Sequence, residues 1–149
     1  RLVAGYCWDW ISKSNKKVND IYFPEYKFSM PWNFAQESYL WSIKPDSVSE
    51  IGCIHTCQGL ELDYVGVIIG PDMFFRDGRV LTDARQRAQT DASLKGFKSM
   101  LKTQPVKANK LADEIIKNTY RTLMTRGMKG CYVYCTDRAL NDYFSLPSS

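Results

Sequence analysis

One run of residues limits the fold more than any other. From Val65 to Ile69 the chain is apolar or glycine at every position, and Gly70 and Pro71 close the run. A strand with apolar residues on both faces is typical of the centre of a parallel sheet, because such a sheet is covered on both sides. A Gly-Pro pair ends any regular element. We therefore expect a layered α/β domain with a mainly parallel sheet.

Other segments fit around this central strand. Short apolar runs near residues 2–7, 50–55 and 130–135 are predicted to be further strands. Asp77 and Gly78 lie between two β-type runs, which predicts a small hairpin inserted after the central strand. The 149 residues suit a single domain.

A helix is predicted before the last strand. Residues spaced four apart share one face of a helix, and here they are Leu111, Ile115, Thr119 and Leu123. We expect this helix to begin at the capping residue Asn109 and to run to Thr125 or Arg126, with Gly127 as its stop. A short helix over 137–144 closes the chain.

The cysteines allow two interpretations. Cys53, His55 and Cys57 form one cluster in the sequence, and Cys131 and Cys135 form another, so a zinc site would require the two clusters to converge. Both clusters lie on apolar, β-rich runs, where cysteine behaves as a small core residue. We expect core packing, free thiols and no bound metal. With no secretory signal, and with no apolar run of about eighteen residues, we expect a cytoplasmic protein without a membrane span.

The charge is strongly asymmetric. Residues 95–129 carry nine Lys or Arg against two Asp or Glu, a net charge of +7, while the whole chain carries only +4. Such a stripe suits a polyanion, either nucleic acid or the phosphates of a nucleotide. A solvated helix face explains the charge equally well.

The aromatic residues are also unevenly placed. Eleven of the twenty lie within residues 1–41. Those after residue 20 are Tyr22, Phe23, Tyr26, Phe28, Trp32, Phe34, Tyr39 and Trp41. They could stack on nucleic-acid bases, but packing on the sheet is expected because aromatic side chains bury most area. This region matches no motif.

The phosphate-binding loops of nucleotide enzymes are absent from the sequence. It contains no G-x-x-x-x-G-K-[ST] and no G-x-G-x-x-G after a strand. Asp72, just past the central strand, is compatible with a magnesium-binding acid, although an ordinary strand end explains it better. The sequence therefore lacks the means to bind and hydrolyse a nucleotide alone.

Two segments carry residues suited to phosphate chemistry. In I-H-T-C-Q-G-L-E-L-D-Y, Gly59 would let the backbone approach a phosphate, and Glu61 could accept a hydrogen bond from a ribose hydroxyl. His55 and Thr56 could donate to a nucleic-acid phosphate. In N-T-Y-R-T-L-M-T-R-G-M-K-G, Arg126 stands where a helix leads into a buried strand, a rigid support for an arginine finger.

These segments resemble known motifs. The first is similar to motif V of superfamily 1 helicases and the second to motif VI. Together with R-L-V-A-G-Y-C-W-D-W at the start, the chain more closely resembles the bacterial schlafen group 3-like DNA/RNA helicase family, over residues 1–10, 51–72 and 118–135.

The resemblance implies a three-layer RecA-like domain of the P-loop NTPase type, the C-terminal half of a motor whose N-terminal half carries Walker A and B. Gly59 and Glu61 would contact the nucleotide, Thr56 the nucleic-acid backbone, and Arg126 would be the finger. Gln58 is expected beside the nucleotide at the domain interface. Arg121 is the second candidate arginine, but its five-residue offset turns it about 140° away from Arg126.

The expected activity belongs to a longer protein. ATP and Mg²⁺ would bind between this domain and an N-terminal RecA-like domain, DNA or RNA would be the partner, and the isolated chain would be inactive. Arg1 stands within an apolar run, which suggests a boundary close to the missing half. Two alternatives are a nucleic-acid-binding or protein-interaction module that uses residues 95–129, and a zinc-binding domain.

Overall fold

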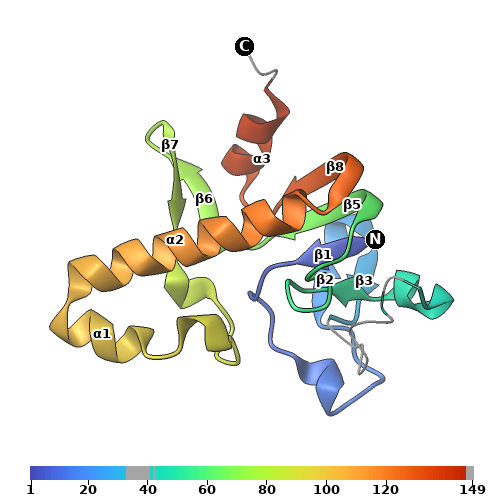
Figure 1. Ribbon diagram of the computed structural model, residues 1–149, viewed down its shortest axis with the longest axis horizontal. Helices are drawn as coiled ribbons and strands as arrows, with labels where there is room; N and C mark the ends of the chain where they lie inside the picture. The colour runs from blue at the N-terminus through green and yellow to red at the C-terminus, as the bar shows by residue number, and fades with distance from the viewer. Residues whose placement is uncertain (33–40, 42, 147–149) are drawn as a thin grey trace.

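The computed structural model describes residues 1–32, 41 and 43–146. Its centre is a four-stranded sheet in the order β4-β1-β5-β8, and every neighbouring pair is parallel (Figure 1). The strands are β1 (Leu2–Ala4), β4 (Ile51–Gly52), β5 (Leu62–Ile69) and β8 (Gly127–Cys135). The predicted α/β class and the central strand over Val65 to Ile69 are confirmed.

The two faces of the sheet are covered differently. Helix α2 (Pro105–Met124) packs on one face, where Val65 and Val67 of β5 share a core cluster with Ile116 and Leu123. A second cluster on the other face holds Ile68 of β5 together with aromatic residues from the N-terminal region.

An antiparallel hairpin covers this second face. Strands β2 (Ile21–Phe23) and β3 (Phe28–Met30) form it, and the Phe23 ring packs edge-on against Tyr134 of β8. In the part of the chain that the structure describes, the three layers are therefore helix, sheet and hairpin. Aromatic side chains from the N-terminal region pack on this second face, and they bury large areas from a short segment.

The predicted hairpin insertion is confirmed. Strands β6 (Met73–Arg76) and β7 (Arg79–Thr82) are joined by Asp77 and Gly78, which have φ values of 52° and 75°. Two successive positive φ angles are those of the tight turn favoured in hairpins. Helix α3 (Arg138–Ser145) packs against β6 and β8 and confirms the closing helix.

The boundaries of α2 differ from the prediction. The helix begins at Pro105 rather than Asn109, because proline suits the first turn, where its missing N–H is not needed. It ends at Met124, and Gly127 already belongs to β8. Gly127 has no positive φ; an added Cβ would clash with the carbonyl of Gly130, so its small size is required by the strand and not by a helix stop.

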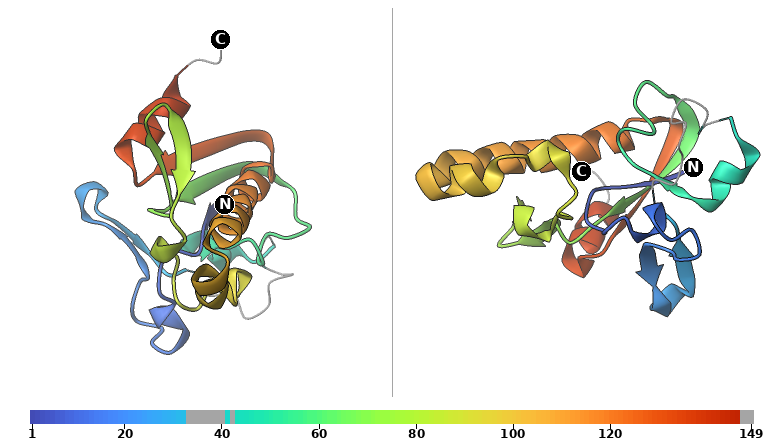
Figure 2. Two further views of the ribbon diagram at one scale, coloured as in Figure 1. Left: turned by 90° about the vertical axis from the view of Figure 1, so that its left-hand side faces the viewer. Right: turned by 90° about the horizontal axis from the view of Figure 1, so that it is seen from below.

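Helix α1 (Phe97–Thr103) precedes α2 and lies alongside its first turns. Figures 1 and 2 show that the two helices extend together beyond the edge of the sheet as an arm. Single 3-10 turns complete the fold at 11–13, 24–26, 45–49, 84–86 and 92–94. None of the described helices is long and apolar enough to cross a membrane.

Candidate nucleotide and nucleic-acid site

The segment 53–61 connects β4 to β5 and crosses the face of the sheet on which α2 packs. Cys57 is fully buried in the core cluster beneath α2, and Ile54 and Leu60 pack against that cluster. Three apolar anchors therefore hold the loop against the sheet and α2. Apart from the buried Thr56, the side chains between the anchors are exposed.

Thr56 gives the loop its shape. Its Oγ1 donates to the carbonyl of Cys53 (2.8 Å) and accepts from the amide of the same residue (2.6 Å), so the hydroxyl closes a tight turn after β4. The side chain is buried, and an added Cβ at Gly52 would come within 2.7 Å of its Oγ1. The predicted contact of Thr56 with nucleic acid stays a prediction, and here its hydroxyl is fully used within the loop.

Four predicted residues project from this loop. His55, Gln58, Gly59 and Glu61 are all exposed. The His55 ring lies edge-on to Tyr6, with 5.9 Å between the centroids. Gly59 has a φ of +75°, and a Cβ placed on it would meet no atom within 4 Å, so its backbone stands open to solvent. The structure places these residues together along one exposed stretch.

Arg126 lies beside the same loop. Its carbonyl accepts a hydrogen bond from the amide of Leu62 at 2.9 Å, which joins the end of the α2 segment to the start of β5. Burial and the neighbouring Cys53 raise the pKa of Cys57 to about 11, and the positive charge of Arg126 opposes this rise. The two predicted segments therefore meet at the amino ends of β5 and β8.

The Arg126 guanidinium is half-buried and its Nε donates to the carbonyl of Thr122 at 3.2 Å. No carboxylate among the described residues pairs with it. A guanidinium held by a backbone contact, with no anion of its own, can receive an external phosphate or carboxylate.

Arg121 does not join this group. It is exposed, and its Nη1 donates to Oδ1 of Asn118 at 3.3 Å, one turn earlier on α2. The expected divergence of Arg121 and Arg126 around the helix agrees with these different environments. Arg126 is accordingly the arginine that the fold brings to the loop.

A second group of polar residues, missed by the sequence analysis, lies at the carboxyl end of β5. Asp72 and Arg87 are buried, and Arg87 Nη1 lies 3.0 Å from Oδ2 of Asp72. The Nε of Arg87 lies 2.7 Å from Oδ2 of Asp91, which is also buried. Burial alone would lower the pKa of Arg87, but the two carboxylates outweigh it and raise that pKa. The guanidinium thus bridges two carboxylates inside the protein.

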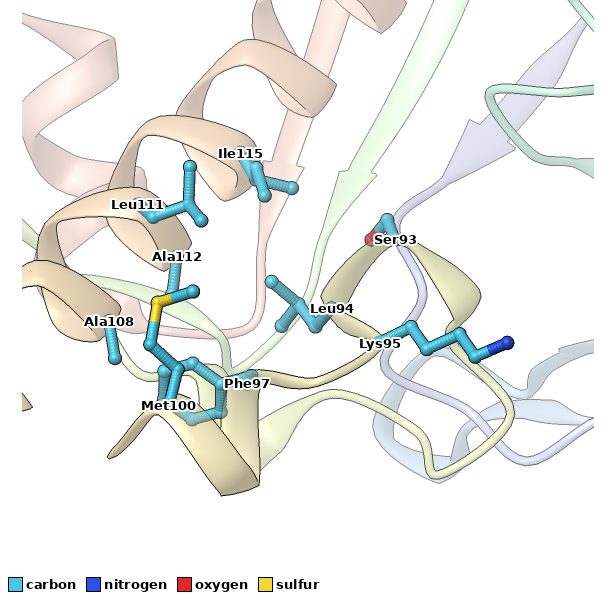
Figure 3. Close-up of a pocket in the computed structure, with 9 residues that line it drawn as sticks. All are labelled: Ser93, Leu94, Lys95, Phe97, Met100, Ala108, Leu111, Ala112 and Ile115. Atoms are coloured by element: carbon cyan, nitrogen blue, oxygen red, sulfur yellow. The ribbon is translucent and has the colours of Figure 1, made fainter. Parts of the chain in front are cut away.

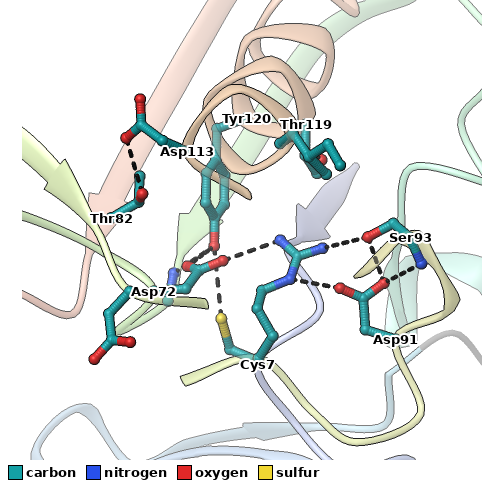
Figure 4. Close-up of polar contacts among 12 residues, drawn as sticks. Cys7, Asp72, Thr82, Asp91, Ser93, Asp113, Thr119 and Tyr120 are labelled. Carbon is teal, nitrogen blue, oxygen red and sulfur yellow. Dashed lines mark hydrogen bonds and ion pairs between the residues drawn. The ribbon is translucent and has the colours of Figure 1, made fainter. Parts of the chain in front are cut away.

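Tyr120 of α2 joins the same group, as Figure 4 shows. Its hydroxyl donates to Oδ1 of Asp72 at 2.5 Å and accepts from the amide of Gly70 at 3.0 Å, while the Cys7 thiol lies 3.8 Å away. Asp72 is therefore occupied by an arginine and a phenol within the core. The interpretation of Asp72 as a magnesium-binding acid has no support in this arrangement. Asp72 lies in the turn that follows β5, as expected of a strand end, and its carboxylate is held within the core.

The cysteines mostly follow the core-packing interpretation. All five are free thiols; Cys53, Cys57 and Cys135 are buried, whereas Cys131 is exposed on β8. Across the described residues, no group of three or more His, Cys, Asp or Glu side chains is arranged to hold a metal ion. The zinc alternative has no support in this geometry.

The aromatic region divides between core and surface. Trp32 and Trp41 are fully buried, and Phe23 and Phe28 pack in the cluster beneath the sheet, whereas Tyr22 and Tyr26 are exposed. Packing on the sheet is confirmed for the buried members. Phe34 and Tyr39 lie outside the described residues.

Comparisons with known proteins support the resemblance to the schlafen group 3 family. The family described as Schlafen group 3, DNA/RNA helicase domain, matches residues 1–137. An uncharacterized protein of Saccharomyces cerevisiae is 32% identical over 123 residues, which cover 81% of this chain.

The matched region spans only 26% of the length of the yeast protein. No solved structure matches the chain significantly. The family match covers nearly the whole described sheet, α2 and the two segments that meet at Arg126. The chain belongs to the schlafen group 3 DNA/RNA helicase domain family.

Proposed function

We propose that the chain is the C-terminal, RecA-like motor domain of an ATP-dependent helicase or translocase that acts on DNA or RNA. The family match supports a helicase-like function connected with nucleic acid. The observation that carries the motor role is the position of Arg126. It is a cation that no carboxylate of the described residues pairs with, and it is fixed next to the loop that holds Gly59 and Glu61.

In this proposal the nucleotide lies between this domain and an N-terminal RecA-like domain of the same polypeptide. ATP with Mg²⁺ supplies a transferable phosphoryl group. Arg126 stabilises the charge that develops on that group, as an arginine finger does. The described residues offer no carboxylate cluster for Mg²⁺, so the metal would be held by the other half.

The other residues of the loop 53–61 would contact the phosphate and ribose of the nucleotide, the second domain and the nucleic acid. The open backbone at Gly59 suits close approach of a phosphate, and the exposed carboxylate of Glu61 suits a ribose hydroxyl. Gln58, exposed between the anchors of the loop, would face the other domain. His55 would meet the nucleic-acid backbone with its exposed ring. Thr56 would have to exchange its two hydrogen bonds to Cys53 to do so.

The test is Arg126→Ala in the full-length parent protein, with ATP turnover measured in the presence of nucleic acid. Removal of an arginine finger lowers kcat by about 10³–10⁵-fold. Arg79→Ala is the matched control, because it removes the same charge from an exposed position on β7, outside the loop 53–61 and outside α2. Turnover near wild type for Arg126→Ala, or an equal loss for both variants, would refute the finger assignment.

A further inference from the structure

The exposed side of α2 carries a row of cations. At 100° per residue, Lys107, Lys110, Lys117 and Arg121 lie within an arc of about 80°. The buried residues of the helix lie on the opposite side: Ala108, Ala112, Ile116, Thr119, Tyr120 and Leu123. Because the core fixes the rotation of α2, the cations form a ridge that points away from the sheet. We call these four residues the α2 ridge.

Helix α1 adds charge to the same arm. Figure 3 shows Phe97 and Met100 of α1 directed toward Ala108, Leu111 and Ala112 of α2, around a small apolar pocket. This contact docks α1 along the first turns of α2. The exposed Lys98 and Lys102 are thereby carried on the arm near the start of the ridge.

Most of these charges have no ion-pair partner within the part of the chain that the structure describes. There, Lys117 is the one ridge residue in an ion pair, with Asp113 one turn earlier at 2.9 Å. Among the described residues, no carboxylate pairs with Lys98, Lys102, Lys107, Lys110 or Arg121. Glu114 is the one other acidic residue within 95–129.

Cations on other elements are paired more often. Arg76 lies 3.1 Å from Asp137, Arg85 lies 2.9 Å from Asp83, and Lys129 lies 2.9 Å from Asp63. A solvated helix that only needs solubility commonly alternates both signs of charge. The nearly uniform sign of the arm indicates a surface for an extended anion.

We propose that the arm formed by α1 and α2 binds the phosphate backbone of nucleic acid, at a surface separate from the loop 53–61 and Arg126. From Lys107 to Arg121 the ridge is about 21 Å long at 1.5 Å per residue. One strand carries a phosphate about every 3.4 Å of duplex axis, so this length spans about six phosphates. Lysine and arginine on a helix contact the backbone without reading sequence, so the binding would be non-specific.

The inference rests on the proposed function in its choice of partner, but it is tested without ATP. Binding of a fluorescent oligo(dT) strand of about 20 nucleotides is measured by anisotropy with the 149-residue chain over a range of salt concentrations. An RNA of equal length is measured in parallel. We expect binding that weakens steeply with salt, because phosphate contacts release counterions.

The decisive variant combines Lys107→Gln, Lys110→Gln and Arg121→Gln. Removing three phosphate contacts should reduce the slope of log affinity against log salt by about 2, since each contact contributes about 0.7 on a single strand. The matched control removes three exposed charges elsewhere, by Lys17→Gln, Lys27→Gln and Arg79→Gln, and should leave the slope close to wild type. Thermal melts confirm that both variants fold.

Three results would overturn the proposal: no binding of either strand at low salt, an unchanged slope in the ridge variant, or an equal reduction in the control. If the ridge variant keeps the wild-type salt slope while Arg126→Ala abolishes ATP turnover in the parent protein, this inference alone is refuted. If the ridge variant shows the reduced slope while Arg126→Ala leaves turnover near wild type, the motor role alone is refuted.

Discussion

The phenol of Tyr120 on α2 donates a hydrogen bond of 2.5 Å to the buried carboxylate of Asp72, which lies 48 residues earlier just past β5. The same oxygen accepts from the amide of Gly70. Burial, together with the negative charge of Asp72, raises the pKa of Tyr120 well above its ordinary value, so the phenol keeps its proton. One hydroxyl therefore fixes the rotation of α2 against the carboxyl end of the central strand.

Tyr120→Phe removes this hydroxyl and leaves the Gly70 amide and one oxygen of Asp72 without that partner. A buried polar group that loses its partner costs about 1–3 kcal/mol, so we expect the free energy of unfolding to fall by this amount in urea titrations. Tyr143→Phe is the control, because that side chain is exposed and its ring stacks on Phe75. Equal stability of the two variants would show that the hydroxyl of Tyr120 does not hold α2.

Arg87→Gln should be more damaging. The guanidinium is the buried cation that pairs with both Asp72 and Asp91, and breaking a buried pair by removing one partner costs about 3–5 kcal/mol. Arg85→Gln should change the stability little, because Arg85 is exposed and its pair with Asp83 is screened by water. Urea or thermal unfolding of the two variants gives the comparison. A loss at Arg87 no larger than at Arg85 would contradict the role of the network.

The sequence predicts those parts of the fold that depend on local pattern. Val65 to Ile69 indicates a central strand because both faces are apolar, and Asp77 with Gly78 indicates a hairpin because both tolerate positive φ. The β2–β3 hairpin is not predicted. Its turn over Pro24–Tyr26 ends at Lys27, whose φ of 51° is unusual for a residue with a side chain, so no turn signal marks it.

The candidate site, like the fold, is predicted only in part from the sequence. The loop residues and Arg126 are identified by their resemblance to two motifs, and the fold brings those segments together through the bond between Leu62 and Arg126. The buried network is missed because its members are distant in sequence and each has an ordinary local context. Arg87 in particular stands in a polar segment, and only the tertiary fold buries it against Asp72.

Chemical labelling should distinguish the thiols. Cys131 is exposed, whereas burial raises the pKa of Cys57 to about 11 and that of Cys135 to about 12. At pH near 8 a disulfide reagent should therefore modify one thiol of the native protein quickly and the remainder only after unfolding, because thiolates react and buried thiols do not ionise. Cys131→Ser should abolish the fast phase. A fast phase that survives this substitution would place a second reactive thiol at the surface.

Asp137 should make the stability depend on acid pH. Its Oδ2 accepts from the amide of Leu140 at 2.8 Å, which caps α3, and from the amide of Phe75 at 3.3 Å, while Oδ1 lies 3.1 Å from Arg76. Burial alone would raise the pKa of Asp137, but these amides and Arg76 outweigh it and lower that pKa. A carboxylate with a lowered pKa stabilises the fold above the ordinary carboxyl range, and this contribution is lost as the pH falls through the folded-state pKa.

Asp137→Ala should therefore lower the free energy of unfolding at pH 7 by about 0.5–2 kcal/mol, the usual value of an N-cap. The difference from wild type should shrink as the pH falls below the ordinary carboxyl range and through the lowered pKa of Asp137, where the carboxylate of the wild type becomes protonated. Asp137→Asn keeps an oxygen that can cap α3, so it should retain most of the stability at pH 7 and lose this part of the pH dependence. Urea titrations of the three proteins across that range provide the measurement. A difference between wild type and Asp137→Ala that stays constant from pH 7 to pH 3 would show that the charge of Asp137 contributes nothing, and that only its shape as a cap matters.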